Sequence, residues 1–226
     1  MRRVLVTGGT RGIGAAVAAR FGALGDAVVA VGRAECDVTD ESAVAALFER
    51  VGPVDVLVNN AGIATSAPLA RTTVEQWHST MDVNALGAFL CTRAALPGMV
   101  ERDHGRIITV ASTAGLAGAR YTSAYSAAKH AAVGLMRAVA AEVAGTGVTC
   151  NAVCPTFVRT DMTTESVRRV AHLTGRSEAD AERSIAGMSP LGRLLEPDEV
   201  ADAVLFLADA AAVNGQALVL DGGGVT

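Results

Sequence analysis

The chain has 226 residues, of which 50% are hydrophobic and 4% aromatic, so its core must be built mainly from Ala, Val and Leu. Its formal net charge is −4 without any block of like charges, which argues against a nucleic-acid-binding surface and a polybasic membrane anchor. The apolar run at residues 4–7 is too short for a signal peptide or a membrane span, so we expect a cytoplasmic protein.

The first predicted strand, residues 4–7, runs directly into a turn that contains Gly8, Gly12 and Gly14. A helix is predicted over residues 15–24, so a strand, a glycine turn and a helix follow one another. This arrangement points free backbone N–H groups at an anion, and its place after the first strand favours a dinucleotide. The spacing G-x-x-x-G-x-G differs from the common G-x-G-x-x-G fingerprint, and a helix cap or a tight turn would also explain the glycines.

The second predicted strand, residues 27–32, is followed by Arg33. Dinucleotide-binding folds that prefer NAD carry a carboxylate at this strand end, whereas an arginine suits the 2′-phosphate of NADP. Arg11 in the glycine turn can add a second cation. These residues favour NADP(H) over NAD(H).

The connection after Arg33 is unusually short, because only residues 34–36 precede the segment 37–40. A crossover between parallel strands needs about a dozen residues or more. The third strand and its helix are therefore expected to be missing or reduced to a loop. The sheet should be one strand smaller than in similar folds, and the adenine side of the pocket more open.

A helix is predicted from Asp40, a good helix cap, to about residue 51, and a buried strand over residues 54–58. The strand leads into Asn60, Ala61 and Gly62. Small residues at the carboxyl end of a strand let the backbone approach a ligand closely.

Residues 73–102 predict a long helix, interrupted near Pro97, with Asn84 near its middle. Asparagine is unfavourable inside a helix, so it is either tolerated there or opens the helix to hold a water. The next strand, residues 106–111, leads to Ser112.

The helix predicted over residues 121–144 carries Tyr125 and Lys129, which share one face because they are four positions apart. Lys129 is the only lysine among 19 basic residues. An ammonium beside a phenol favours the phenolate and lowers its pKa, which allows proton exchange nearer neutral pH. A stray lysine on a solvated helix face is the alternative explanation for such a pair.

The remaining elements are a strand at residues 148–153, two short helices within 161–195, a helix at 197–208 and a strand at 217–220. Strands that alternate with helices predict an α/β fold with a doubly wound, Rossmann-like parallel sheet and helices on both faces. No linker or repeat is evident, so residues 1–226 are expected to form one domain.

The cysteines and histidines offer no metal-binding pattern. No C-x-x-C pair occurs, and no histidine lies at a zinc-like spacing from a cysteine. We therefore expect no metal, and we expect the cysteines to be small buried side chains. They are Cys36, Cys91, Cys150 and Cys154.

These motifs occur in an order and at a spacing that resemble the short-chain dehydrogenase/reductase family over essentially the whole chain. The motifs are Thr7-Gly-Gly-Thr-Arg-Gly-Ile-Gly14, Asn59-Asn-Ala-Gly62, Asn84, Ser112, Tyr125-x-x-x-Lys129 and Pro155 with Thr160. One departure is Thr156, which follows Pro155 where the family usually has glycine. A β-branched residue tolerates positive φ poorly, so this turn should either differ from the family's turn or use an ordinary φ.

The resemblance implies four catalytic residues. Tyr125 would be the general acid/base, and Lys129 would hold the nicotinamide ribose and lower the pKa of the tyrosine. Ser112 would hydrogen-bond the substrate oxygen, and Asn84 would position a water that relays protons behind the lysine.

The resemblance also implies a cofactor site with a phosphate loop, a 2′-phosphate contact, adenine contacts, a ribose side and a carboxamide clamp. The phosphate loop comprises Gly8, Gly9, Thr10, Arg11, Gly12, Ile13 and Gly14, and Arg33 is the 2′-phosphate contact. The adenine contacts are Asp37 and Val38, and the ribose side is formed by Asn60, Ala61 and Gly62. The carboxamide clamp is Val158 and Thr160, and the catalytic Tyr125 and Lys129 also belong to the cofactor site.

Residues 156–195 are expected to form a substrate-binding lid. The run from residue 187 to residue 199 is similar to bacterial 3-oxoacyl thioester reductases and aromatic polyketide ketoreductases. In the lid, one set of arginines could meet the phosphates of a CoA or carrier-protein arm, namely Arg168, Arg169 and Arg176. The alternative is a solvated face on which Glu165 pairs with Arg168 or Arg169, and Asp180 with Arg183.

The leading hypothesis is an NADP(H)-dependent reductase of a 3-oxoacyl thioester or a polyketide-like ketone. One alternative is an NAD(H)-dependent dehydrogenase of a hydroxyacyl-CoA, a cyclic alcohol or a polyol. Another is a dinucleotide-binding sensor without chemistry, although a pure binder needs no proton donor. Family members commonly assemble through their long helices, so a homotetramer or homodimer is expected, without nucleic acid or membrane partners.

Overall fold

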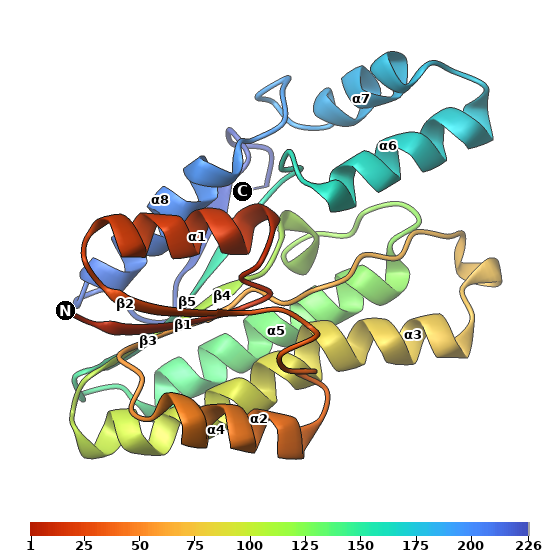
Figure 1. The fold of residues 1–226 in the computed structure, drawn as a ribbon. Helices are drawn as coiled ribbons and strands as arrows, with labels where there is room; N and C mark the ends of the chain where they lie inside the picture. The colour runs from red at the N-terminus through yellow and green to blue at the C-terminus, as the bar shows by residue number, and fades with distance from the viewer. Residues whose placement is uncertain (226) are drawn as a thin grey trace.

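The computed structural model describes residues 1–225, so the last residue of the predicted 1–226 domain lies outside the described part. It has a six-stranded sheet with helices on both faces (Figure 1). All strand pairs are parallel, in the order β2-β1-β3-β4-β5-β6. The strands are β1 (Arg3–Thr7), β2 (Ala27–Val31), β3 (Val56–Asn59), β4 (Gly105–Val110), β5 (Val148–Pro155) and β6 (Ala217–Leu220). The predicted Rossmann-like fold is confirmed.

Two helical layers cover the sheet (Figure 1). One layer holds α1 and α8, which contribute Phe21 and Leu207, respectively, to one hydrophobic core. The other holds α2, α4 and α5, with Leu47, Met99 and Met136 in a second core. These helices are α1 (Gly12–Ala23), α2 (Glu41–Val51), α4 (Gly87–Glu101), α5 (Ser123–Glu142) and α8 (Pro197–Asp209).

The chain changes direction at β1, which pairs with β2 on one side and with β3 on the other. In open parallel sheets, ligands bind beyond the carboxyl ends of the strands at such a switch point. The loops after β1 and β3 therefore mark the ligand-binding edge.

The sheet is shortened at β2, as the short connection predicts. Within residues 1–225, β2 pairs with β1 alone and therefore forms an edge of the sheet. Residues 32–40 lead from β2 to α2, whose first backbone N–H groups, those of Ser42 and Ala43, donate to the side chain of Asp40.

The interruption predicted near Pro97 is wrong in its position. Pro97 lies inside α4, between Ala95 and Met99, which are both buried and hold the helix against the sheet. The irregular turn occurs earlier, where α3 (Val74–Met81) passes into a π-helical turn at Asp82–Leu86 before α4. Tertiary packing therefore outweighs the helix-breaking tendency of proline here.

Two helices, α6 (Asp161–Thr174) and α7 (Glu178–Ala186), extend beyond the sheet (Figure 1). They confirm the two short helices predicted within residues 161–195. They share a small core of their own, in which Val167 packs with Ile185 and Leu194.

Candidate active site

The glycine turn after β1 packs so closely that side chains are excluded. A Cβ on Gly14 would lie 2.2 Å from the carbonyl oxygen of Gly8, and one on Gly8 would lie 2.8 Å from the Cα of Ala61. Gly8 and Gly12 also have φ values of 61° and 52°, which favour glycine. The backbone of this turn, at the start of α1, is therefore free to cradle a phosphate group.

The side chain of Asn60 ties the loop after β3 to this glycine turn. Its Nδ2 donates to the carbonyl oxygens of Thr7 at 3.1 Å and Gly8 at 2.9 Å. In return, the Thr7 hydroxyl accepts from the backbone N–H groups of Asn60 and Ala61. Asn60 therefore shapes the cradle and leaves the backbone of residues 60–62 facing the ligand-binding edge.

Asn84 lies in the π-helical turn and is 2% exposed. Its Nδ2 donates to the carbonyl oxygens of Thr80 and Ile63, whereas its Oδ1 is buried without a hydrogen-bond partner in the described residues. A Cβ on Gly62 would lie 2.8 Å from this Oδ1 and 3.6 Å from the Nζ of Lys129. An orphaned buried acceptor near an ammonium is suited to hold a water or a ligand hydroxyl.

Tyr125 and Lys129 project from α5 toward the end of β4, where Ser112 begins the short helix Thr113–Gly115. Lys129 is 5% exposed, and its Nζ donates to the carbonyl oxygen of Val110 at 2.9 Å. The same Nζ lies 5.8 Å from the centroid of the Tyr125 ring. Lys129 is therefore buried within the candidate site, and the alternative that it is a stray lysine on a solvated helix face is wrong.

Burial controls the protonation of this pair. It lowers the pKa of Lys129 to about 8. It also raises the pKa of Tyr125, against the opposing effect of the Ser112 hydroxyl. The predicted lowering of the tyrosine pKa by the lysine is therefore not seen, because desolvation of the phenolate dominates.

The thiol of Cys154, at the end of β5, lies behind this site. Burial raises its pKa to about 11, and a hydrogen bond from the backbone of Ser112 and the charge of Lys129 only partly oppose this shift. All four cysteines are free and buried, as predicted. Cys154 is therefore a neutral buried thiol near Ser112 and Lys129.

The predicted adenine end lies at the carboxyl end of β2. Arg33 is 90% exposed, and its guanidinium lies 3.5 Å from the carboxylate of Asp37. Hydrogen bonds from the backbone and hydroxyl of Thr39 lower the pKa of Asp37. The side chain of Val38 is buried against Gly87, so only its backbone remains for an adenine contact.

The segment after β5 lies against the glycine turn. The Thr160 side chain would be 3.2 Å from a Cβ on Gly12, and the Thr156 N–H donates to Leu220. Thr156 has no positive φ, which confirms the expected ordinary turn.

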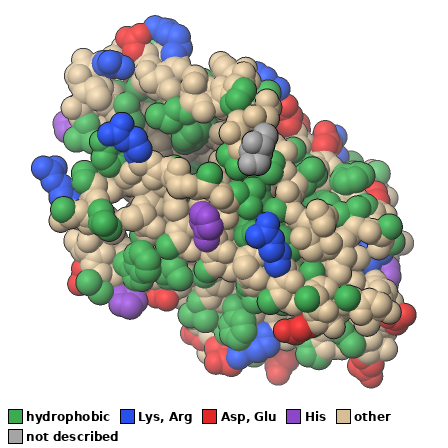
Figure 2. Space-filling model, turned by 180° about the vertical axis from the view of Figure 1, so that it is seen from behind, with side chains coloured by type: hydrophobic (Ala, Val, Ile, Leu, Met, Phe, Trp, Pro, Cys, Tyr) green, Lys and Arg blue, Asp and Glu red, His purple; other side chains and the backbone are tan. Residues whose placement is uncertain are grey.

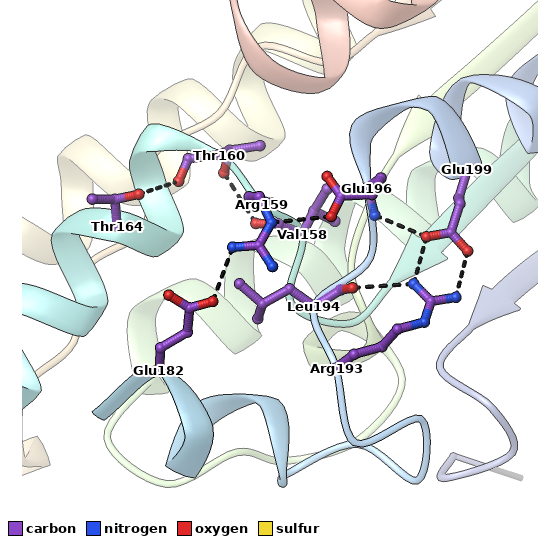
Figure 3. Close-up of polar contacts among 9 residues, drawn as sticks. All are labelled: Val158, Arg159, Thr160, Thr164, Glu182, Arg193, Leu194, Glu196 and Glu199. Atoms are coloured by element: carbon purple, nitrogen blue, oxygen red, sulfur yellow. Dashed lines mark hydrogen bonds and ion pairs between the residues drawn. The ribbon is translucent and has the colours of Figure 1, made fainter. Parts of the chain in front are cut away.

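Figure 3 shows how Arg159 anchors this segment. Its guanidinium contacts Glu182 of α7 at 2.9 Å and Glu196, just before α8, at 3.0 Å. Next to it, Val158 forms a parallel β-bridge with Leu195. These contacts fix the position of the segment that carries Val158 and Thr160.

The comparisons with known proteins agree with this geometry. The family model described as Enoyl-(Acyl carrier protein) reductase matches residues 8–225. The chain belongs to the short-chain dehydrogenase/reductase family. This is a family of NAD(P)-dependent oxidoreductases that act on CH–OH and C=O groups.

Two relatives and one solved structure show which members of the family this short-chain dehydrogenase/reductase is similar to. A protein of Streptomyces coelicolor named "Putative ketoacyl reductase" is 40% identical over 97% of this chain and 95% of its own length. The 3-oxoacyl-[acyl-carrier-protein] reductase FabG of Escherichia coli is 35% identical over 97% and 95%. The crystal structure of a variant of actinorhodin polyketide ketoreductase with NADPH matches this chain with a TM-score of 0.91 and 36% identity. The match covers 100% of this chain and 97% of the ketoreductase chain.

The arginines of α6 and α7 in this short-chain dehydrogenase/reductase only partly follow the solvated-face alternative. Asp180 and Arg183 form the expected ion pair. Within residues 1–225, Glu165 pairs with neither neighbouring arginine. Arg169 donates to the Ser66 carbonyl oxygen, at 3.3 Å. Arg169 therefore reaches from α6 to the loop that follows β3.

Replacing Gly14 with alanine should destabilise the enzyme by about 2–3 kcal/mol, since the new methyl group would overlap backbone that has little room to move. It should also weaken cofactor binding. Chemical denaturation and a cofactor titration would measure the two effects. Gly22→Ala, in the same helix with no atom within 4 Å of its added Cβ, is the matched control and should be neutral or slightly stabilising. Equal effects of both variants would contradict the cradle.

Proposed function

We propose that the chain is an NADPH-dependent reductase that reduces the ketone of a 3-oxoacyl thioester or a polyketide-like substrate. The observation that supports it most is the convergence of Asn84, Ser112, Tyr125 and Lys129 at one edge of the sheet, beside a glycine cradle. The named ketoacyl, 3-oxoacyl and polyketide reductases among its relatives point to the same substrate class.

The cradle and the orphaned Asn84 oxygen fit a nicotinamide cofactor. In this proposal, residues 8–14 hold the pyrophosphate and Arg33 the 2′-phosphate. Asp37 and the Val38 backbone lie at adenine, and residues 60–62 and Lys129 at the ribose. Val158 and Thr160 hold the carboxamide. When bound, the cofactor supplies the hydride that attacks the carbonyl carbon.

Side chains of the protein carry out the proton transfers. The Ser112 hydroxyl donates a hydrogen bond to the substrate oxygen and stabilises the negative charge that develops there. As the C=O π electrons move onto that oxygen, Tyr125 transfers its phenolic proton to it, which gives the alcohol. Lys129 uses one of its three N–H donors on Val110, which leaves two for ribose and water. Asn84 Oδ1 accepts from a water that returns a proton toward the tyrosine.

Residues 156–195 act as the substrate lid in this proposal. Arg168, Arg169 and Arg176 form no ion pair within the described residues, so their charge remains available to the phosphates of a CoA or carrier-protein arm. We place the enzyme in the cytoplasm.

Parallel fluorescence titrations with NADPH and NADH, followed by turnover of a thioester panel, test the proposal. We expect tighter NADPH binding and reduction of 3-oxoacyl thioesters in preference to cyclic ketones. NADH binding at least about tenfold tighter than NADPH would contradict the role of Arg33. Cofactor binding without turnover of any carbonyl would instead support the non-catalytic sensor.

The surface of the α3–α4 run supports an oligomer. The helical run Val74–Glu101 has a mean hydropathy of 1.3 over an 18-residue window, so it could cross a membrane by length and composition alone. The same run supplies Leu90 and Met99 to the core, while Trp77 and Phe89 remain about 40% exposed. Figure 2 shows hydrophobic side chains on the face it views, with acidic side chains mainly at the margin. We propose that a second copy of the chain covers Trp77 and Phe89.

Light scattering should therefore report a dimer or a tetramer, and Phe89→Arg should shift it toward the monomer. Phe89 lies on α4 and is 39% exposed, so the fold of one chain should tolerate the arginine. Gly22→Arg, on α1, where an added Cβ meets no atom within 4 Å, should leave the assembly unchanged. A monomeric wild-type protein would contradict the oligomer.

A further inference from the structure

The carboxyl end of β2 carries a carboxylate that lies outside the strand itself. Glu35 is exposed, and its Oε2 accepts a hydrogen bond from the Gly32 N–H at 2.8 Å. The Gly32 carbonyl oxygen in turn accepts from the N–H groups of Glu35 and Cys36. Residues 32–36 therefore form a compact turn that folds the Glu35 side chain back over the strand end.

This turn borders the phosphate loop. The Gly9 N–H donates to the carbonyl oxygen of Val31 at 3.0 Å, which joins the loop to the end of β2. A Cβ on Gly32 would lie 2.8 Å from the Thr10 hydroxyl and 3.1 Å from Glu35 Oε2. The Glu35 carboxylate and the Thr10 side chain thus flank the same glycine.

In dinucleotide folds, a carboxylate at this strand end accepts a hydrogen bond from the 2′-hydroxyl of the adenosine ribose. The same charge disfavours a 2′-phosphate at this place. Here Gly32 has no side chain to supply it, but Glu35 brings a carboxylate to the same strand end. Arg33, which favours the phosphate, lies next to it and is already 3.5 Å from the Asp37 carboxylate. The strand end therefore carries both signs of charge.

We propose that Glu35 is a specificity-determining residue that opposes Arg33. Its carboxylate receives the 2′-hydroxyl of NADH and disfavours the 2′-phosphate of NADPH, which narrows the preference of the enzyme for NADPH. The inference rests on the proposed nicotinamide-dependent function. The short connection explains why Glu35 lies here, because three residues leave room for a tight turn but for no helix.

Equilibrium titration of Glu35→Gln with NADPH and NADH tests the inference. Glutamine keeps an oxygen that can accept from the Gly32 N–H, so the turn is retained while the charge is removed. We expect the Kd for NADPH to fall about fivefold and the Kd for NADH to rise about threefold, as expected for loss of one partly screened charge. Glu49→Gln, the same change at an exposed position of α2 without an ion pair in residues 1–225, is the control and should change neither Kd.

Opposite shifts for the two cofactors would support the inference. Unchanged constants, or equal changes for both cofactors, would overturn it, since the effect must act at the 2′ position. Arg33→Gln should shift the constants in the reverse directions, and a shift in the same directions as in Glu35→Gln would also overturn it. Failure of the wild-type protein to bind either cofactor would overturn the proposed function itself, which is a distinguishable result.

Discussion

Lys129→Arg should lower kcat/KM by at least about a hundredfold and leave a folded protein. The Lys129 side chain is 5% exposed, and its Nζ reaches Val110 at 2.9 Å. The backbone of α5 at Lys129 packs closely against Gly115, where an added Cβ would lie only 2.8 Å from the carbonyl oxygen of Lys129. Helix α5 therefore has little room to shift and accommodate a longer side chain. A guanidinium is a wide planar fork, whereas this narrow site fits a compact ammonium.

Steady-state kinetics, circular dichroism and a cofactor titration would separate loss of turnover from loss of fold. The matched control is Arg137→Lys, which makes the reverse exchange two turns later at an exposed position of α5. It should retain normal activity. Near-wild-type turnover in Lys129→Arg would show that any cation suffices and that the geometry around Val110 is unimportant.

Features that depend on neighbours in the sequence could be predicted well. The order of strand, glycine turn and helix at residues 3–23 is as expected, and Asp40 caps α2 as expected. Counting three residues after Arg33 was enough to predict the shortened sheet, because a crossover has a minimum length. In each case the physical constraint acts within a few positions of the chain.

Features that depend on distant contacts could not be predicted. Arg159 meets Glu182 and Glu196, which are 23 and 37 positions away, and no local spacing indicates these pairs. The irregular turn formed at Asn84 and not at Pro97, because buried neighbours hold α4 together around the proline. The tyrosine pKa likewise depends on burial, which helix spacing does not reveal.

Tyr125→Phe should lower kcat by about a thousandfold or more while the affinity for the cofactor stays close to that of the wild-type protein. The change removes only the hydroxyl that, in the proposed mechanism, carries the proton. Two other titratable groups lie nearby, and neither replaces it. The Lys129 ammonium faces Val110, and burial raises the pKa of Cys154 to about 11. Single-turnover kinetics with saturating cofactor would isolate the chemical step.

Tyr121→Phe is the control, since Tyr121 is the only other tyrosine in the sequence. It is 54% exposed, and among residues 1–225 its hydroxyl accepts a hydrogen bond only from Arg120, at 3.5 Å, so turnover should not change. The pH profile sharpens the comparison. Because burial raises the pKa of Tyr125, the phenol stays protonated through neutral pH, and the reductive direction should keep its rate there. Oxidation of the alcohol needs the phenolate, so its rate should rise as the pH increases, and a Tyr125→Phe variant that keeps this rise would show that another group carries the proton.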